Sequence, residues 1–268
     1  MYPCCGNVRR NKNKHKINKT KTYRIMSKQI LKDKIALITG ASRGIGAEIA
    51  KAYAAAGAHV ILIARTARAL ENVDDAINEI GGQATLMPLD LMKLDELELL
   101  GPTLYERFGR LDIFVANAGL LGTLSPLAHG KLREWQKVMD TNVTANFQMI
   151  RSLDPLLRKS EAGRAIFVTS GVARKDDRAY WGAYKVSKAA LEALAMSYAA
   201  ETTKTNLRVN VLDPGRVRTK MRASAYPGEN PEDVPHPEVL MPAFLELAST
   251  DCTKHGEIIT AQTHSKAA

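Results

Sequence analysis

The sequence predicts an α/β fold, a single-domain doubly wound parallel sheet of about seven strands with helices on both faces. From residue 35 onward, short runs of aliphatic and β-branched residues alternate with amphipathic stretches of helical length. Runs that are apolar on both faces, such as IALIT at 35–39 and HVILIA at 59–64, are typical of strands covered by helices on each side. With 268 residues, of which 45% are hydrophobic, the chain can bury one core of this size.

The order of the elements follows from this alternation. The predicted strands are short apolar runs at residues 35–39, 59–64, 84–89, 111–116, 165–170, 207–212 and 257–261. The predicted helices have apolar residues at helical spacing and cover residues 44–56, 67–80, 93–108, 131–158, 181–204 and 238–249. No internal repeat or interdomain linker interrupts them, so we expect one domain over residues 27–268.

The formal net charge of +10 is concentrated at the amino terminus. Residues 1–25 contain eight basic residues and no acidic one, which leaves +2 for the rest of the chain and no footprint for a polyanion there. Low hydrophobicity and like charge predict a disordered basic tail over residues 1–26. An arm that binds RNA or anionic lipid is one interpretation. We favour an inert tail, because Met26 opens MSKQILKDK directly before the first strand.

The sequence predicts neither a membrane span nor a metal site. No apolar stretch follows the N-terminal charges, and no run of 18 apolar residues occurs, so secretion is not indicated and a cytoplasmic protein is expected. Cys4, Cys5 and Cys252 are an odd count without ligand spacing, and the six histidines form no cluster.

A glycine-rich turn, TGASRGIG, follows the first strand directly and leads into a helix. Gly40 permits a tight turn, Gly44 lets the backbone approach a pyrophosphate, and Gly46 allows the helix to pack closely on the strand. The N–H groups at the start of the helix would then face the anion. Such a turn can also be purely structural, so this motif alone does not establish a dinucleotide site.

The end of the second strand indicates which dinucleotide is preferred. An acidic residue there would hydrogen-bond the ribose 2′-OH, whereas this sequence has Ala64 followed by Arg65. Ser42 and Arg43 of the glycine turn can close on the same position, and two guanidinium groups suit a 2′-phosphate. The sequence therefore favours NADP(H) over NAD(H). The alternative is that both arginines are ordinary solvated surface charges.

Two further strand ends carry candidate cofactor contacts. Asp90, after the third strand, can accept a hydrogen bond from an adenine amine. The turn Asn117-Ala118-Gly119 follows the fourth strand and lets the backbone lie beside a ligand. Both lie at the carboxyl ends of strands, where ligands of such sheets bind.

Tyr184 and Lys188 are four residues apart at the start of a predicted helix, so their side chains share one face. A cation within about 4–6 Å stabilises a phenolate and lowers the phenol pKa by about 1–3 units, toward the range useful for proton transfer. A surface Tyr–Lys pair is the structural alternative. The context favours chemistry, because Ser170 ends the fifth strand and Asn142 lies on the preceding long helix, and both can reach the same sheet edge.

Residues 214–237 break the alternation, with five prolines and two glycines, and are predicted to be irregular. A long irregular segment after the carboxyl end of a strand is often a lid over a ligand site. A surface insertion without a role is the alternative.

Taken together, these motifs resemble the classical short-chain dehydrogenase/reductase family, in order and in approximate spacing, over about residues 30–260. The matching positions are Gly40-x-x-x-Gly44-x-Gly46, Asn117-Ala118-Gly119, Asn142, Ser170, Tyr184-x-x-x-Lys188 and Pro214-Gly215-x-x-x-Thr219. The resemblance is nearest to the branch of β-ketoacyl-acyl-carrier-protein reductases, and it implies a Rossmann-type fold.

The resemblance implies a role for each matching residue. Ser170 would hold the carbonyl oxygen of the substrate, and Tyr184 would donate or accept the proton. Lys188 would lower the tyrosine pKa and bind the nicotinamide ribose, while Asn142 would hold a water in a proton relay. The implied NADP(H) contacts are Gly40, Ser42, Arg43, Gly44, Ile45, Gly46, Arg65, Asp90, Leu91, Asn117, Ala118, Gly119, Tyr184, Lys188, Pro214, Gly215, Val217 and Thr219.

Three departures from the family pattern stand out. The interval from Ser170 to Tyr184 is one residue longer than is common, with the extra residue expected within 174–178. Asp213 precedes Pro214 where a small or amide residue is usual, and the sequence does not explain it. The carboxyl terminus lacks the apolar, glycine-bearing tail of the bacterial carrier-protein reductases.

The leading hypothesis is an NADPH-dependent reductase of a small carbonyl compound, reversible to alcohol oxidation. The substrate is either free or bound to an acidic acyl carrier protein, which arginines such as Arg133, Arg174 and Arg178 would attract. A non-catalytic dinucleotide-binding regulator is the second hypothesis, disfavoured by the intact Ser170, Tyr184 and Lys188. The resemblance also implies a homodimer or homotetramer through the long predicted helices. Nucleic-acid binding is disfavoured.

Overall fold

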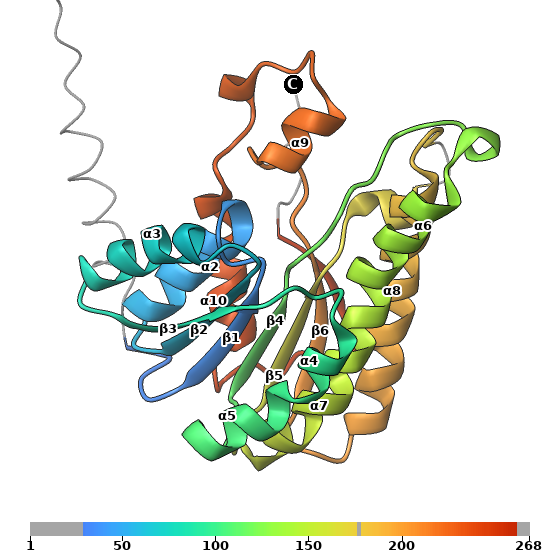
Figure 1. Ribbon diagram of the computed structural model, residues 1–268. Helices are drawn as coiled ribbons and strands as arrows, with labels where there is room; N and C mark the ends of the chain where they lie inside the picture. Colours follow the sequence, from blue (N-terminus) through green and yellow to red (C-terminus); the bar gives the residue numbers. More distant parts are fainter. Residues whose placement is uncertain (1–28, 176–177, 262–268) are drawn as a thin grey trace, which may run out of the picture.

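A computed structural model describes residues 29–175 and 178–261, so the predicted basic tail over residues 1–26 lies outside the described residues. The predicted parallel sheet is confirmed, with seven strands in the order β3-β2-β1-β4-β5-β6-β7 (Figure 1). The strands are β1 (Ile35–Thr39), β2 (His59–Ala64), β3 (Gln83–Pro88), β4 (Ile113–Ala116), β5 (Arg164–Val168), β6 (Arg208–Asp213) and β7 (Ile258–Thr260). Strand order reverses between β1 and β4, where sheets of this kind bind ligands.

Helices cover both faces of the sheet, as Figure 1 shows. They are α2 (Gly44–Ala55), α3 (Ala67–Asn78), α4 (Leu94–Glu98), α5 (Leu100–Phe108), α6 (Leu132–Met139), α7 (Ala145–Lys159), α8 (Gly182–Thr202), α9 (Lys220–Ala225) and α10 (Met241–Ala248). One core cluster packs α2, α3 and α10 on one face, and the other packs α4, α5, α7 and α8 on the opposite face. Alternate residues of a strand enter opposite clusters, since Ile38 joins the first and Leu37 the second.

Two predicted long helices are interrupted. The stretch predicted as 93–108 forms α4 and α5, and α5 approaches α7 so closely that a Cβ on Gly101 would lie 2.0 Å from the carbonyl oxygen of Ser152. The stretch predicted as 131–158 forms α6 and α7, joined by a π-helical turn over Asp140–Thr144. A π-turn adds a residue within a helix and is frequent at functional sites. This turn contains Asn142.

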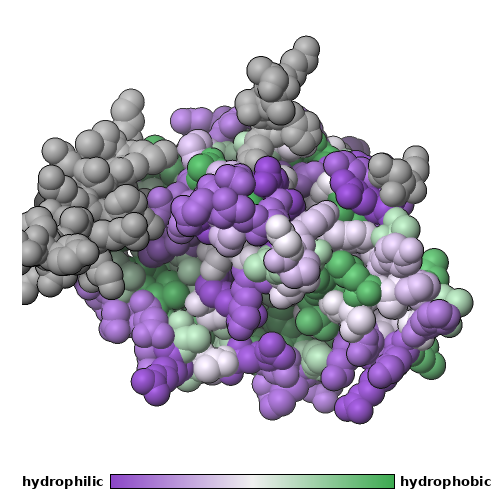
Figure 2. All heavy atoms as spheres, turned by 90° about the horizontal axis from the view of Figure 1, so that it is seen from above, coloured by the Kyte–Doolittle hydropathy of each residue, from purple (hydrophilic) through white to green (hydrophobic). Residues whose placement is uncertain are grey.

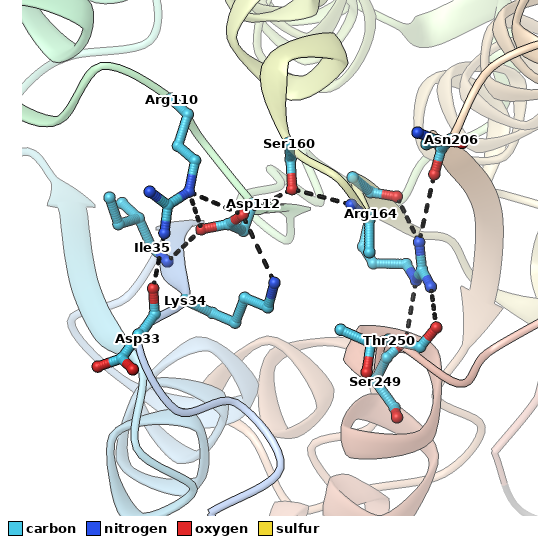
Figure 3. Close-up of polar contacts among 12 residues, drawn as sticks. Asp33, Lys34, Ile35, Arg110, Asp112, Ser160, Arg164, Asn206, Ser249 and Thr250 are labelled. Atoms are coloured by element: carbon cyan, nitrogen blue, oxygen red, sulfur yellow. Dashed lines mark hydrogen bonds and ion pairs between the residues drawn. The ribbon is translucent and has the colours of Figure 1, made fainter.

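A polar network joins the amino ends of the central strands (Figure 3). Asp112, directly before β4, accepts a hydrogen bond from the backbone N–H of Ile35 at 2.9 Å and one from the hydroxyl of Ser160 at 2.6 Å. Arg164, at the start of β5, donates to the carbonyl oxygens of Ser249 and Thr250 at 2.9 and 2.8 Å. Both charged side chains are buried and have partners, so this edge of the sheet is structural.

The segment predicted to be irregular, 214–237, contains more structure than expected. It holds α9 and a 3₁₀ turn over Pro231–Asp233, and it stands beyond the carboxyl end of β6 in Figure 1. Glu229 accepts hydrogen bonds from Arg222 at 2.6 Å and from Arg216 at 2.9 Å. These ion pairs join residues 216, 222 and 229 of the segment. The number of prolines and glycines in the sequence does not predict such contacts. Figure 2 looks onto this end of the molecule, where hydrophilic side chains surround smaller apolar areas.

Candidate active site

The glycine turn between β1 and α2 has backbone angles and close contacts that favour glycine. Gly40 and Gly44 have φ values of 65° and 57°, in the left-handed region that favours glycine. A Cβ on Gly46 would lie 2.3 Å from the carbonyl oxygen of Gly40 and 2.6 Å from Nδ2 of Asn117. The packing role predicted for Gly46 is therefore a contact with the turn itself. A tight turn leading into a helix amino end fits the pyrophosphate of a dinucleotide.

Thr39, which the sequence interpretation did not single out, fastens this turn to the next strand. Its Oγ1 accepts hydrogen bonds from the backbone N–H groups of Asn117 and Ala118, both at 3.0 Å. The side chain of Asn117 donates back to the carbonyl oxygen of Thr39 at 2.9 Å. Asn117 thus joins two strand ends, while Gly119 and the backbone of Ala118 remain as candidates for ligand contact. A threonine directly before the glycine turn was the only sequence signal for this brace.

The predicted contacts for the adenosine end separate into exposed and buried residues. Arg43 and Arg65 are exposed, and neither makes an ion pair with any residue in the described part of the chain. Oδ1 of Asp90 accepts a hydrogen bond from the backbone N–H of Met92 at 3.1 Å. Leu91 buries its side chain in the second core cluster, so its backbone groups are what it offers a ligand. Val217, predicted as a cofactor contact near Pro214 and Gly215, buries its side chain in the first cluster.

The structure brings the four predicted catalytic residues together. Ser170 follows β5, and its hydroxyl lies near enough to Tyr184, in the first turn of α8, to lower the pKa of the phenol. Nζ of Lys188 lies 5.8 Å from the centre of the Tyr184 ring and donates to the carbonyl oxygen of Val168 at 2.8 Å. A Cβ on Gly119 would be 3.5 Å from both Nζ of Lys188 and Oδ1 of Asn142, so Gly119 borders the same site.

The Asn142 side chain is fully buried in the π-turn and holds two elements together. Its Oδ1 accepts a hydrogen bond from the backbone N–H of Leu120 at 2.7 Å. Its Nδ2 donates to the carbonyl oxygen of Leu120 and to Oγ of Ser187, both at 2.9 Å. Both amide protons are thereby used, so a water bound to this side chain would have to donate to Oδ1. The water-holding role from the family resemblance stays a prediction.

Burial governs the pKa values of the tyrosine and the lysine. Desolvation raises the pKa of Tyr184 to about 12, against the lowering effect of the hydrogen bond from Ser170, and Asp213 raises it further. Desolvation lowers the pKa of Lys188 to about 8, while Glu192 raises it. The predicted depression of the tyrosine pKa is therefore wrong for the chain by itself, because burial of the phenol is the largest effect on this pKa and raises it.

The buried lysine makes a testable contribution to stability. Its folded pKa lies below its ordinary value, so between about pH 8 and 10.5 the unfolded chain binds a proton that the folded chain does not. The free energy of unfolding of the natural chain, relative to a Lys188→Met variant, is expected to rise with pH in that window by up to about 3 kcal/mol. Urea unfolding at a series of pH values measures this difference. A flat difference would show that Lys188 is not desolvated.

Aromatic side chains from two elements lie beside Tyr184. The ring of Trp181 lies 5.9 Å from that of Tyr184 and 5.7 Å from that of Tyr226, which follows α9. The guanidinium of Arg222 lies 4.3 Å from the centre of the Tyr226 ring. The segment 214–237 therefore contacts the start of α8 through Tyr226. Sequence reasoning missed both aromatic residues, because only the fold brings them together.

The backbone before α8 has an unusual conformation. Tyr180 has a φ of 71°, which is rare for a bulky residue, and its carbonyl oxygen accepts a hydrogen bond from the N–H of Ser125 at 3.1 Å. A cavity of about 260 Å³ lies beside this point, and Leu127, Trp135 and Gly182 are among its lining residues. It gives apolar space next to the helix that carries Tyr184.

The described residues hold neither a candidate metal cluster nor a candidate membrane-spanning helix. Within residues 29–175 and 178–261, no three His, Cys, Asp or Glu side chains are placed to hold a metal ion. In the same part of the chain, no helix combines the length and the apolar character needed to cross a membrane.

Comparison with known proteins identifies the family. The family described as short chain dehydrogenase matches residues 34–230. The uncharacterized oxidoreductase YciK of Escherichia coli K12 is 43% identical over 225 residues, which are 83% of this chain and 88% of that protein. A crystal structure of a short chain dehydrogenase from E. coli CFT073, complexed with NADPH, matches with a TM-score of 0.84 and 41% identity over 88% of this chain and all of the other. A rhamnolipid-biosynthesis 3-oxoacyl-[acyl-carrier-protein] reductase from Pseudomonas aeruginosa is 38% identical, over 71% of this chain and 75% of that protein. This chain therefore belongs to the short chain dehydrogenase family of oxidoreductases.

Proposed function

We propose that this enzyme transfers a hydride between NADP(H) and a carbonyl or secondary alcohol group, with Tyr184 as the proton donor in reduction. The observation that carries the proposal is the convergence of Ser170, Tyr184 and Lys188 beside Gly119, at the same sheet edge as the glycine turn. The NADPH complex of the E. coli relative supports the choice of cofactor. The cofactor supplies the hydride, and the chain supplies orientation and the proton.

The protonation states suit reduction at neutral pH. A Tyr184 pKa of about 12 keeps the phenol protonated, so it can donate to the oxygen of a carbonyl that becomes an alcohol. The hydroxyl of Ser170, already next to the phenol, would donate a second hydrogen bond to that oxygen. Lys188 is cationic below about pH 8. Its charge favours negative charge on the phenol oxygen of Tyr184 and on the substrate oxygen. We expect alcohol oxidation, which needs the phenolate, to require higher pH.

Cofactor choice is assigned to the two exposed arginines. An Arg65→Ala variant is expected to weaken NADPH binding about 10-fold to 100-fold and to leave NADH binding within about threefold, because a charge-assisted contact to the 2′-phosphate is lost. Fluorescence titration with each cofactor measures this selectivity. An Arg107→Ala variant on α5 is the control for loss of one exposed arginine. Equal weakening of both cofactors would remove Arg65 from 2′-phosphate recognition.

The test of the proposed function is a panel of aldehydes, ketones and β-ketoacyl thioesters, assayed by loss of NADPH absorbance and repeated with NADH. We expect turnover of at least one substrate, with NADPH preferred. Failure of the whole panel, with NADPH binding intact, would overturn the proposal in favour of a dinucleotide-binding regulator.

A carrier-protein substrate is the finer version of this proposal. The names of the P. aeruginosa relative and of a 35% identical protein from Synechocystis, a 3-oxoacyl-[acyl-carrier-protein] reductase, support it. Turnover of a β-ketoacyl group on the carrier, compared with the same group on a short free thioester, distinguishes the two. A large preference for the carrier-bound form would identify the carrier as partner, and equal turnover would identify a free small molecule.

We also propose that the enzyme is a homodimer or homotetramer. The exposed side chains of Phe147 on α7 and Val186 on α8 support contact between copies through these two helices. Sedimentation of the full chain measures the assembly.

A further inference from the structure

One arginine lies between three elements of the candidate active site. Arg174 ends the 3₁₀ turn Gly171–Arg174, which begins directly after Ser170. Its guanidinium donates to Oε1 of Glu192 on α8 and, at 2.6 Å, to Oδ2 of Asp213 at the end of β6. A planar guanidinium can bridge two carboxylates in a fixed geometry, which a lysine cannot do. Asp213, unexplained in the sequence, thus has a partner.

Each carboxylate is also fastened to its surroundings. Glu192 is 8% exposed, and its Oε1 accepts a further hydrogen bond from the hydroxyl of Thr169 at 2.6 Å. Asp213 is 5% exposed, and its Oδ1 accepts one from the backbone N–H of Gly215 at 3.0 Å. Glu192 therefore connects α8 to the residue before Ser170, and Asp213 holds the Pro214–Gly215 turn.

These carboxylates lie next to the reacting groups. Glu192 is one helical turn after Lys188, on the same face of α8. Among charged groups, Glu192 raises the pKa of Lys188 and Asp213 raises the pKa of Tyr184. Arg174 forms ion pairs with both carboxylates. Two cations and two anions thus balance: Lys188, Glu192 and Asp213 are buried, and the Arg174 side chain is 37% exposed. A buried charge without a partner is costly.

We propose that Arg174, Glu192 and Asp213 form a charge clamp that positions Ser170 and the Tyr184–Lys188 pair for proton donation. This inference rests on the proposed function, and it makes the three residues positioning residues. Arg174 is then committed within the molecule rather than available to a carrier protein. The clamp fixes the distance between α8 and the turn Gly171–Arg174 that follows Ser170. It also determines how much negative charge from Glu192 acts on Lys188.

The test compares three variants in the full chain, with kcat and its pH profile measured on a substrate that the panel identifies. Arg174→Met is expected to lower kcat about 10-fold to 100-fold through misplacement. We assign the alkaline limb, the fall of kcat at high pH, to deprotonation of Lys188. Arg174→Met is also expected to move this limb up by about 1 pH unit, since the unbalanced carboxylates favour the ammonium form of Lys188. Glu192→Gln, nearly isosteric, is expected to move that limb down. Arg174→Lys is expected to lower kcat, because a lysine cannot bridge Glu192 and Asp213. It is expected to leave the alkaline limb near its original pH, because the positive charge is kept.

Arg158→Met is the matched control, because Arg158 forms an exposed ion pair with Asp154 on α7 at 2.8 Å. It is expected to leave kcat and its pH profile unchanged. A purely structural clamp would lower kcat in the clamp variants without opposite shifts of the limb, and unchanged kcat in all three would overturn positioning. If Arg174→Met does not fold, Glu192→Gln and Arg174→Lys decide the outcome.

A measurement without substrate separates this proposal from the proposed function. NMR titration of the Lys188 side chain, assigned by its loss in Lys188→Met, gives the lysine pKa directly. A higher Lys188 pKa in Arg174→Met and a lower one in Glu192→Gln would support the charge role of the clamp, even if no carbonyl were reduced. An active enzyme whose lysine pKa does not move in either variant would overturn that charge role and leave the proposed function standing.

Discussion

A Tyr184→Phe variant is expected to lose about 10²–10⁴-fold in NADPH-dependent carbonyl reduction. The substitution removes one oxygen atom, the proposed proton donor, and keeps the ring against Trp181 at the start of α8. The cofactor site is expected to stay intact, because the glycine turn and its brace from Thr39 do not involve the phenol hydroxyl. Steady-state kinetics and NADPH titration of the same preparation measure the two effects separately.

The control for this experiment is Tyr180→Phe. Tyr180 is four residues earlier and 61% exposed, and its backbone contact to Ser125 is independent of its hydroxyl. It is expected to leave kcat within about twofold, as is usual for a surface change. A Tyr184→Phe enzyme as active as the natural chain would assign proton donation to another group.

A Gly46→Ala variant is expected to abolish cofactor binding and to destabilise the fold by about 3 kcal/mol. The added Cβ would lie 2.3 Å from the carbonyl oxygen of Gly40 and 2.6 Å from Nδ2 of Asn117. The first of these is backbone, which cannot move aside as a flexible side chain can. The turn and the start of α2 must separate, which distorts the surface that would bind a pyrophosphate.

Gly228→Ala is the matched control, because no described residue other than its chain neighbours has a heavy atom within 4 Å of a Cβ at this position. Thermal unfolding and NADPH titration are the measurements for both variants. We expect Gly228→Ala to behave like the natural chain. Tight NADPH binding by Gly46→Ala would show that the glycine turn is not the dinucleotide site.

The sequence predicted the sheet well where burial is simple. The bounds of β1 and β2 agree with the prediction, because strands covered on both faces are continuous apolar runs between turns. The glycine turn and the approach of Tyr184, Lys188 and Ser170 were also predictable. Each lies at a strand end or on one helix face, and a parallel sheet collects such positions at one edge.

The features that the sequence did not reveal depend on contacts between distant segments. The π-turn at Asn142 and the helix α9 interrupt or add to otherwise ordinary patterns. The pair Trp181 and Tyr226 and the bridge from Arg174 to Asp213 join residues 45 and 39 positions apart. The pKa of Tyr184 was predicted with the wrong sign because local spacing shows the cation but not the burial.

In the proposed reaction, hydride reaches a carbonyl carbon of the substrate while Tyr184 protonates the carbonyl oxygen. The most direct measurement uses NADPH carrying deuterium at both C4 positions, with mass spectrometry of the product formed from a carbonyl substrate. We expect one deuterium bound to the carbinol carbon of the new alcohol, and loss of that product in Tyr184→Phe. An alcohol without carbon-bound deuterium, or labelled alcohol formed at the natural rate by Tyr184→Phe, would contradict it.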